Sequence, residues 1–410
     1  MVLAALREAS WLTGRRLRDY STILIAAYAV AALWALTGQG INDPLGRPLG
    51  TDFLSFWTVS SALHGDQARA IYSPEGLAAL EHAVDPAASG GLFYAWAYPP
   101  IALLLVYPLA LLPYLWSLAV WLVVGLAAYL AALWRILPGR LTLWAGLAFP
   151  AVFICLSHGQ NGLLTAALLG WGLLLLPGWP TLAGVLIGVI AFKPQLGIVI
   201  PIALAAGGHW RTILAAAATV LVLAAASLAM FGPDAWSDFV ASLPFARSML
   251  ELGLVPYHKM QSAFAATRLA GGSVPLAYAV QGITTLGAAA LVAWVWRRPT
   301  RQELKNAILM TAVPLATPFV LDYDLTLLAF PVAWLARSGL RRQALPWERI
   351  TLAAICLVPL LSRGGALLTH LLVAPLVEAA LLLVLAARIH AEELPRVSQP
   401  RIDGLPTPST

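Results

Sequence analysis

The stretch "YAWAYPPIALLLVYPLALLPYLW", from Tyr94 to Trp116, changes from polar-aromatic to apolar and decides the class of fold. Tyr94, Trp96 and Tyr98 are of the residue types that gather where a membrane meets water. Pro99 and Pro100 follow, and proline is tolerated only in the first turn of a helix. Apolar residues then continue with little interruption. The stretch therefore predicts a helix that enters a lipid bilayer at an aromatic boundary.

The composition extends this reading to the whole chain. Of 410 residues, 60% are hydrophobic and 11% are charged, whereas soluble domains carry about 25% charged residues. The apolar runs are continuous rather than alternating, so they predict helices and not the strands of a barrel. We therefore expect an all-α polytopic membrane protein with about 12 transmembrane helices, each needing about 20 apolar residues.

The apolar runs do not give a clean count of crossings. Basic residues before the first helix and in later loops predict that both termini are cytoplasmic. The runs are odd in number, so at least one must be half-height, re-entrant or merged with its neighbour, and two are too short to span. The runs are 21–37, 99–112, 114–134, 142–157, 161–177, 181–192, 194–207, 210–231, 274–296, 304–317, 322–337, 349–362 and 365–388.

Two long outer loops are expected, over residues 38–98 and 232–273. In the first loop, Phe53, Phe56 and Trp57 follow the i, i+3, i+4 spacing of one helix face, which predicts a short helix lying in the membrane interface. Ser73 and Pro74 fit the N-cap and first position of a second short helix. We expect one transmembrane domain over residues 1–388 and a disordered, Pro-rich cytoplasmic tail over 389–410.

The same topology gathers polar stretches on the outer side: the first loop, "SHGQNG" (157–162), "AFKPQ" (191–195), the second loop and "TPFVLDYD" (317–324). They hold a few carboxylates and several cations. A glycoside hydrolase needs two paired carboxylates. A transferase with a lipid-phosphate sugar donor needs one base for the acceptor hydroxyl and cations for the leaving phosphate. The inventory favours the transferase.

Composition also argues against other classes. The net charge of +6 follows the positive-inside pattern and forms no basic patch with interleaved aromatics, so no nucleic-acid partner is expected. Cys155 and Cys356 lie in apolar runs, where inert core residues are the usual interpretation. No His/Cys cluster has the spacing of metal ligands, so we expect no cofactor and metal-independent activity, with Mg²⁺ or Mn²⁺ as the alternative.

Several segments together resemble glycosyltransferase family 87 over roughly residues 20–340. They are "TDFLSFWTVSSALHG", "AIYSPEG", "FYAWAYPPIALLLVYPLALLP", "SHGQNGLLTAALL", "FKPQLG" and "HKMQSAFAATRL". The resemblance implies a GT-C fold, a polyprenyl-phosphate-linked sugar, mannose first, and inverting transfer to a lipid or glycan acceptor. It also implies a bacterial inner membrane with the active site on the periplasmic side. Where many members carry a histidine-rich Ser-Pro stretch, this chain has "TPFVLDYD".

The family's catalytic aspartate at the start of the first outer loop matches Asp52, whose alternative role is to favour the dipole of the next helix. The family's Gly-Gln motif matches Gly159 and Gln160, and its amide-Ser motif with a later Arg matches Gln261, Ser262 and Arg268. We expect the donor phosphate at Lys193, His258, Lys259 and Arg268. We expect the sugar or acceptor at Tyr98, Gln160, Asn161, Gln261, Asp322 and Asp324.

Other interpretations remain open for these residues and for the protein. Lys193 could snorkel to the interface, the cations of the second loop could be solvated, and the amides and aspartates could cap helix ends. A break near Pro194 also fits a secondary transporter, although no repeated halves are visible. A lipid-glycan ligase or flippase is a third possibility, and lipid profiles with and without the protein would distinguish transfer from transport.

Overall fold

The computed structural model describes residues 2–65, 67–86, 93–341 and 344–393, and within this part every regular element is a helix. Residues 394–410 of the predicted tail, and residues 66 and 87–92 of the first loop, lie outside the described part. The α-helices are α1 (Val2–Glu8), α2 (Gly14–Ala35), α3 (Phe53–His64), α4 (Pro74–Val84), α5 (Ile101–Val106), α6 (Tyr114–Ile136), α7 (Arg140–Ala148), α8 (Pro150–His158), α9 (Gly162–Leu175), α10 (Pro180–Val189), α11 (Ile200–Ala206), α12 (Trp210–Glu251), α13 (Ala263–Leu269), α14 (Val274–Trp296), α15 (Gln302–Leu315), α16 (Ala329–Arg341), α17 (Glu348–Thr369) and α18 (Ala374–Glu393).

Short 3₁₀ helices continue or connect several of these α-helices. They are η1 (Ala68–Ala70), η2 (Tyr107–Leu111), η3 (Ile190–Phe192), η4 (Pro194–Gly197) and η5 (Asp322–Leu328). Proline explains two of the interruptions, because it lacks the N–H that an α-helix needs in its interior. Pro108 lies in the first turn of η2, and Pro194 lies in the first turn of η4.

Within the described residues, five helices are long and apolar enough to cross a membrane: α6, α12, α14, α17 and α18. The pair α7 and α8 makes a sixth if it is one span, although it bends by 57° at Phe149–Pro150. Four shorter apolar helical segments lie at Ile101–Leu111, Gly162–Leu175, Pro180–Phe192 and Pro194–Ala206. The chain is thus a multi-pass membrane protein, while the figure of about 12 spans stays a prediction.

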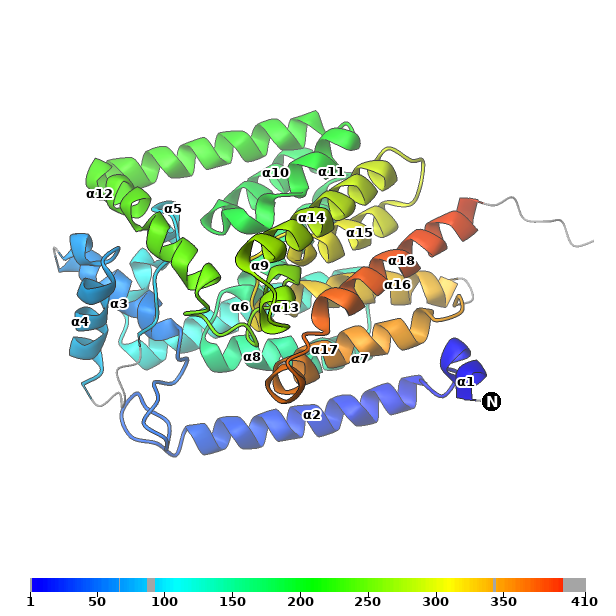
Figure 1. Ribbon diagram of the computed structural model, residues 1–410, viewed down its shortest axis with the longest axis horizontal. Helices are drawn as coiled ribbons and strands as arrows, with labels where there is room; N and C mark the ends of the chain where they lie inside the picture. The colour runs from blue at the N-terminus through cyan, green and yellow to red at the C-terminus, as the bar shows by residue number, and fades with distance from the viewer. Residues whose placement is uncertain (1, 66, 87–92, 342–343, 394–410) are drawn as a thin grey trace, which may run out of the picture.

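The first loop lies at one end of the helix bundle, and the described ends of the chain lie at the other (Figure 1). Helices α3 and α4 occupy the first of these ends, whereas α1 and the end of α18 occupy the second. The prediction that both termini are cytoplasmic stays a prediction, because the arrangement places only the described ends of the chain at one end of the bundle. The N-cap prediction for α4 is confirmed, because the Ser73 hydroxyl accepts from the Gly76 N–H at 3.2 Å and Pro74 opens the helix.

Helix α12 is longer than the sequence predicts. Its apolar part was expected to end at residue 231, but helical structure continues to Glu251 through a kink at Gly232, whose φ of 77° and ψ of 171° are not helical. Glycine adopts this positive φ without the steric cost of a side chain. The second half of α12 then reaches the first loop, where Asp234 pairs with Arg69. Much of the predicted second outer loop is therefore a helix.

The aromatic residues of α3 do not lie in the lipid interface as predicted. Phe53 and Phe56 are fully buried against other parts of the protein, and only Trp57 is half-exposed. Phe53 packs edge-on against Tyr114 and Phe56 against Trp96. The stripe identified from the helical spacing is thus the core face of α3, and the interpretation as a membrane anchor is wrong for Phe53 and Phe56. This packing fixes the start of α3, where Asp52 lies.

Candidate active site

Asp52 precedes α3 and is held by the turn that follows α8. Its backbone N–H donates to the carbonyl of His158 at 3.0 Å. Its Oδ2 accepts from Nε2 of Gln160 at 2.9 Å. The side chain makes no capping hydrogen bond to α3. The half-exposed carboxylate is therefore directed to a partner 108 residues away, and side-chain capping does not account for its position.

Gly159 makes this approach possible. Its φ of 65° is left-handed, a conformation that glycine adopts without strain. A Cβ at this position would stand 2.5 Å from the Cβ of Phe53, so any side chain would push α3 away. The turn presents the carbonyl of His158 and the amide of Gln160 to Asp52. Gly159 thus allows the tight turn, and Gln160, the next residue, makes the hydrogen bond to Asp52.

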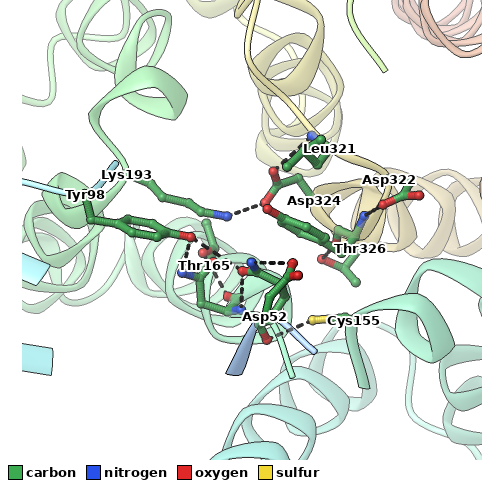
Figure 2. A network of polar contacts seen from close by, with 12 residues as sticks. Asp52, Tyr98, Cys155, Thr165, Lys193, Leu321, Asp322, Asp324 and Thr326 are labelled. Carbon is green, nitrogen blue, oxygen red and sulfur yellow. Dashed lines mark hydrogen bonds and ion pairs between the residues drawn. The ribbon is translucent and has the colours of Figure 1, made fainter. Parts of the chain in front are cut away.

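Tyr98 belongs to the same polar network as Asp52 (Figure 2), and Asn161 contacts both Tyr98 and Gln160. The Tyr98 hydroxyl donates to Oε1 of Gln160 at 3.5 Å and accepts from Nδ2 of Asn161 at 3.1 Å. Oε1 of Gln160 also accepts from the Asn161 N–H at 3.2 Å. The Gln160 amide is thereby oriented with its Nε2 toward Asp52. Oδ1 of Asn161 is buried without a hydrogen-bond partner among the described residues.

Lys193 and Asp324 form a buried ion pair beside this network. Nζ of Lys193 is 2.6 Å from Oδ1 of Asp324, and the residues are 2% and 3% exposed. Nζ also lies 5.0 Å from the centroid of the Tyr323 ring, and Oδ2 of Asp324 accepts from the Leu321 N–H. Lys193 lies at the break between η3 and η4. Asp324 neutralises the charge of Lys193 inside the protein, so the Lys193 side chain does not extend to the membrane interface.

A second polar cluster surrounds Asp322, whose carboxylate points away from Asp324 in Figure 2. Arg363 of α17 approaches Oδ2 of Asp322 at 3.4 Å. His158 and Lys259 lie within electrostatic reach of the same carboxylate. We call Asp322, Arg363, Lys259, His258 and His158 the cationic cluster. His158 belongs to it through its ring while its carbonyl holds Asp52, so the two polar groups are neighbours.

Sequence reasoning missed Arg363. It stands between the apolar runs 349–362 and 365–388, and an isolated charge at such a place is itself a signal of function. Residues 363 and 364 are the gap between these predicted runs, and Arg363 was given no role there. The structure continues α17 through both residues to Thr369.

The side chains of Gln261 and Arg268 make hydrogen bonds that hold the predicted second outer loop (residues 232–273) together. Gln261 is fully buried: its Oε1 accepts from the Ser362 hydroxyl at 2.8 Å and its Nε2 donates to the carbonyls of His258 and Lys259. The guanidinium of Arg268 donates to Gly272 O at 2.7 Å and also to Tyr257 and Glu251. None of these contacts reaches Asp52. Gln261 positions Lys259 and His258, and Arg268 ties α13 to the end of α12.

Glu81 of α4 is a buried carboxyl group that sequence reasoning also missed. It is 2% exposed, its Oε2 accepts from the Tyr94 N–H at 3.0 Å, and its Oε1 has no partner among the described residues. Burial, with a smaller contribution from the charge of Asp52, raises the pKa of Glu81 to about 8 against the hydrogen bond from Tyr94. A glutamate four residues after Leu77, on the buried face of the helix, was the available signal.

Glu81 predicts a pH dependence of stability. Its folded-state pKa is about 8 and its ordinary value is 4.5, so the folded state holds the proton more tightly. Its contribution is complete below the ordinary value and is lost as the pH rises toward and past the folded value. Between pH 5 and pH 8 the loss is about 3–4 kcal/mol. Glu81→Gln should reduce the fall of the thermal unfolding midpoint over this range.

Glu75→Gln is the matched control, because Glu75 lies on the same helix and is exposed. It should leave the pH dependence of the wild-type protein unchanged. An equal fall of the midpoint in the wild type and in Glu81→Gln would show that Glu81 does not titrate in this range.

The described residues contain no group of three or more His, Cys, Asp or Glu side chains that could hold a metal ion. Both cysteines are free thiols, and Cys155 donates to the backbone carbonyl of Gln160 at 3.1 Å. The chemistry available at this end of the bundle is therefore that of one half-exposed carboxylate, a set of amide and hydroxyl groups, and a cationic cluster.

Comparison with known proteins identifies the family of the chain. No curated protein and no solved structure matches the chain. A model of glycosyltransferase family 87 matches residues 96–318, which is more than half of the chain. The match includes Tyr98, Gln160, Asn161 and Lys193, while Asp52 and Arg363 lie outside it. The chain belongs to glycosyltransferase family 87 and is a membrane glycosyltransferase.

Proposed function

We propose that the protein moves one sugar, mannose, from a polyprenyl-phosphate donor to a hydroxyl of a lipid or glycan acceptor. Transfer takes place with inversion on the periplasmic face of the bacterial inner membrane, within a GT-C fold. The observation that carries the proposal is the Asp52 carboxylate. It is half-exposed, makes no capping hydrogen bond, and among the described residues accepts one side-chain hydrogen bond, from Gln160 on Oδ2. Its Oδ1 remains available for an acceptor hydroxyl.

Each step of the proposed reaction has a group to perform it. Asp52 takes the proton of the acceptor hydroxyl as its oxygen attacks the anomeric carbon of the donor. The bond from that carbon to the phosphate oxygen breaks, and the electron pair leaves with the polyprenyl phosphate. A phosphate leaves without a proton when cations hold its charge. The cationic cluster would supply these cations near Asp52, because the His158 carbonyl accepts from the Asp52 N–H and the His158 ring lies within electrostatic reach of Asp322.

Tyr98, Gln160 and Asn161 are suited to hold sugar hydroxyls. Their side chains offer both donors and acceptors, and the unpaired Oδ1 of Asn161 leaves one acceptor open. Lys193 and Asp324 support the same surface from behind through their buried ion pair. In this proposal the pair orders the loop 317–324, and the donor phosphate is held elsewhere. Membership of a glycosyltransferase family favours this function over the transporter alternative.

The test is transfer by the purified protein in lipid nanodiscs. Labelled mannose should pass from mannosyl-phosphoryl-polyprenol to a bacterial membrane-lipid extract and give a new glycolipid by mass spectrometry. GDP-mannose should give no product. Activity should persist in excess EDTA, because Asp322 and Asp324 already pair with protein cations and the cationic cluster can hold a single phosphate.

Three outcomes would count against parts of the proposal. Transfer from GDP-mannose would overturn the lipid-linked donor. Loss of activity in EDTA that Mg²⁺ or Mn²⁺ restores would overturn metal independence. Transfer of another polyprenyl-phosphate sugar in place of mannose would correct the sugar and leave the mechanism in place.

A further inference from the structure

Arg363 is a cation on α17, a helix long and apolar enough to cross a membrane. It lies near the end of α17, and the leucines around it are largely exposed, including Leu360 at 47% and Leu367 at 56%. A charged side chain in such surroundings is costly unless it is paired or serves a ligand. The Arg363 side chain is 35% exposed. It is therefore reachable from the lipid side of the helix.

The pairing of Arg363 with the protein is incomplete. One contact of 3.4 Å joins it to Asp322, and Oδ1 of Asp322 is already bonded to the Tyr323 N–H. A guanidinium offers five N–H donors in a fork that suits two oxygens of one anion. Within the described residues no other hydrogen bond of Arg363 is found. The geometry leaves most of its donors free for a second anion.

Backbone contacts place a second cation, Lys259, near Asp322 and Arg363. The Asp322 N–H donates to Lys259 O at 3.1 Å, and Met260 and Leu321 form an isolated antiparallel bridge. The Lys259 ammonium has no hydrogen bond or ion pair with any described residue. Burial, and then the charges of Arg363 and Lys259, keep the pKa of His258 below its ordinary value. Two permanent cations thus face one carboxylate, which leaves the cluster with an excess of positive charge.

We propose that Arg363 and Lys259 bind the phosphate of the lipid-linked donor, and that Asp322 is the counter-ion which the phosphate displaces from Arg363. The inference rests on the function proposed above. The phosphate approaches from the bilayer along the exposed leucines of α17, where the isoprenoid chain can remain in lipid. His158 lies next to the bound phosphate and through its carbonyl holds Asp52. Arg363 is thereby a ligand for the leaving group.

Binding of polyprenyl phosphate without a sugar tests this inference. The full-length protein in nanodiscs of neutral lipid should bind it. Arg363→Gln and Lys259→Gln should each weaken binding by about 10- to 100-fold, the usual effect of removing one charge-assisted contact. Arg363→Lys should lie between Arg363→Gln and the wild type. Asp322→Asn should bind at least as tightly as the wild type, because the competing carboxylate has gone.

Arg247→Gln is the matched control, since Arg247 is exposed and pairs with Glu251 away from the cluster. It should bind polyprenyl phosphate normally. Lys259 lies in a loop and its ammonium has no partner in the described part of the chain, so Lys259→Gln keeps the test decisive if Arg363→Gln does not fold. Unchanged affinity in Lys259→Gln, or in a folded Arg363→Gln, would overturn the inference. Weaker binding by Asp322→Asn would overturn the role of Asp322 as a displaced counter-ion.

Two further measurements distinguish a donor-phosphate site from a general anionic-lipid site, and failure of this inference from failure of the proposed function. Phosphatidylglycerol that competes as well as polyprenyl phosphate would identify a general anionic-lipid site and overturn the inference. A wild-type protein that transfers mannose while Arg363→Gln and Lys259→Gln bind the donor normally would retain the proposed function and reject only the phosphate site. A wild-type protein that binds no polyprenyl phosphate would reject both.

Discussion

Replacing Asp52 with asparagine is expected to lower the rate of sugar transfer by about 10²–10⁴-fold, the usual effect of losing a general base. Asparagine keeps the size of the side chain and can still accept from Gln160, but it cannot take the acceptor's proton. The fold should persist, because the Asp52 side chain caps no helix. Single-turnover transfer from mannosyl-phosphoryl-polyprenol measures the effect on chemistry.

Binding experiments complete this test. Asp52→Asn should bind polyprenyl phosphate as the wild type does, because the carboxylate is assigned no contact with the donor. Asp43→Asn is a suitable control. Asp43 lies in the same loop, and its carboxylate accepts only local backbone N–H groups of Leu45 and Arg47 among the described residues. Near-normal turnover by a correctly folded Asp52→Asn would remove Asp52 from the chemistry.

Replacing Lys193 with methionine is expected to destabilise the folded protein by about 3–5 kcal/mol, the cost of leaving one buried charge of an ion pair alone. Asp324, 3% exposed, would lose its only cationic partner among the described residues. The thermal unfolding midpoint of the detergent-solubilised protein measures this effect. The sequence instead predicts Lys193 at the donor phosphate, where its replacement would weaken donor binding.

The double variant Lys193→Met/Asp324→Leu should recover much of the stability, because apolar groups of similar volume often replace a buried pair without loss. Lys305→Met is the control, since Lys305 donates to a backbone carbonyl and has no carboxylate partner among the described residues. Stability equal to the wild type in Lys193→Met, together with lost donor binding, would return Lys193 to the phosphate site.

Much of the local structure follows from the sequence because its causes are local. Ser73 and Pro74 start α4 where the N-cap preferences predict, and α3 occupies the stretch chosen from its helical spacing. The spacing of Phe53 and Phe56 identifies one face of α3 but not what covers it. Lipid and protein interior are equally apolar, so hydropathy cannot distinguish an anchor from a core. Only packing against Tyr114 and Trp96 decides this.

The sequence predicts several residues of the candidate site, but it does not predict which of them contact one another. Asp52 and Gln160 were both expected, yet the hydrogen bond between them joins residues 108 apart. Arg268 and Gln261 have the chemistry of a binding site, but loop carbonyls use their donors. Arg363 was missed because its partner Asp322 lies 41 residues earlier and in another element. Residue type thus indicates which groups can act, and long-range packing determines which of them meet.

The ion pair between Lys193 and Asp324 has a consequence for biosynthesis. The two residues are 131 positions apart, so at about 5–20 residues per second the ribosome needs roughly 7 to 26 seconds to reach Asp324 after Lys193. During that interval Lys193 lacks the carboxylate that pairs with it in the folded protein, and we expect it to stay hydrated at the membrane surface. The break between η3 and η4 can enter its final position only when the loop 317–324 arrives. We therefore expect the end of the bundle that holds this ion pair to assemble late in membrane insertion, so a nascent chain that stops before Asp324 should remain sensitive to proteases near Pro194.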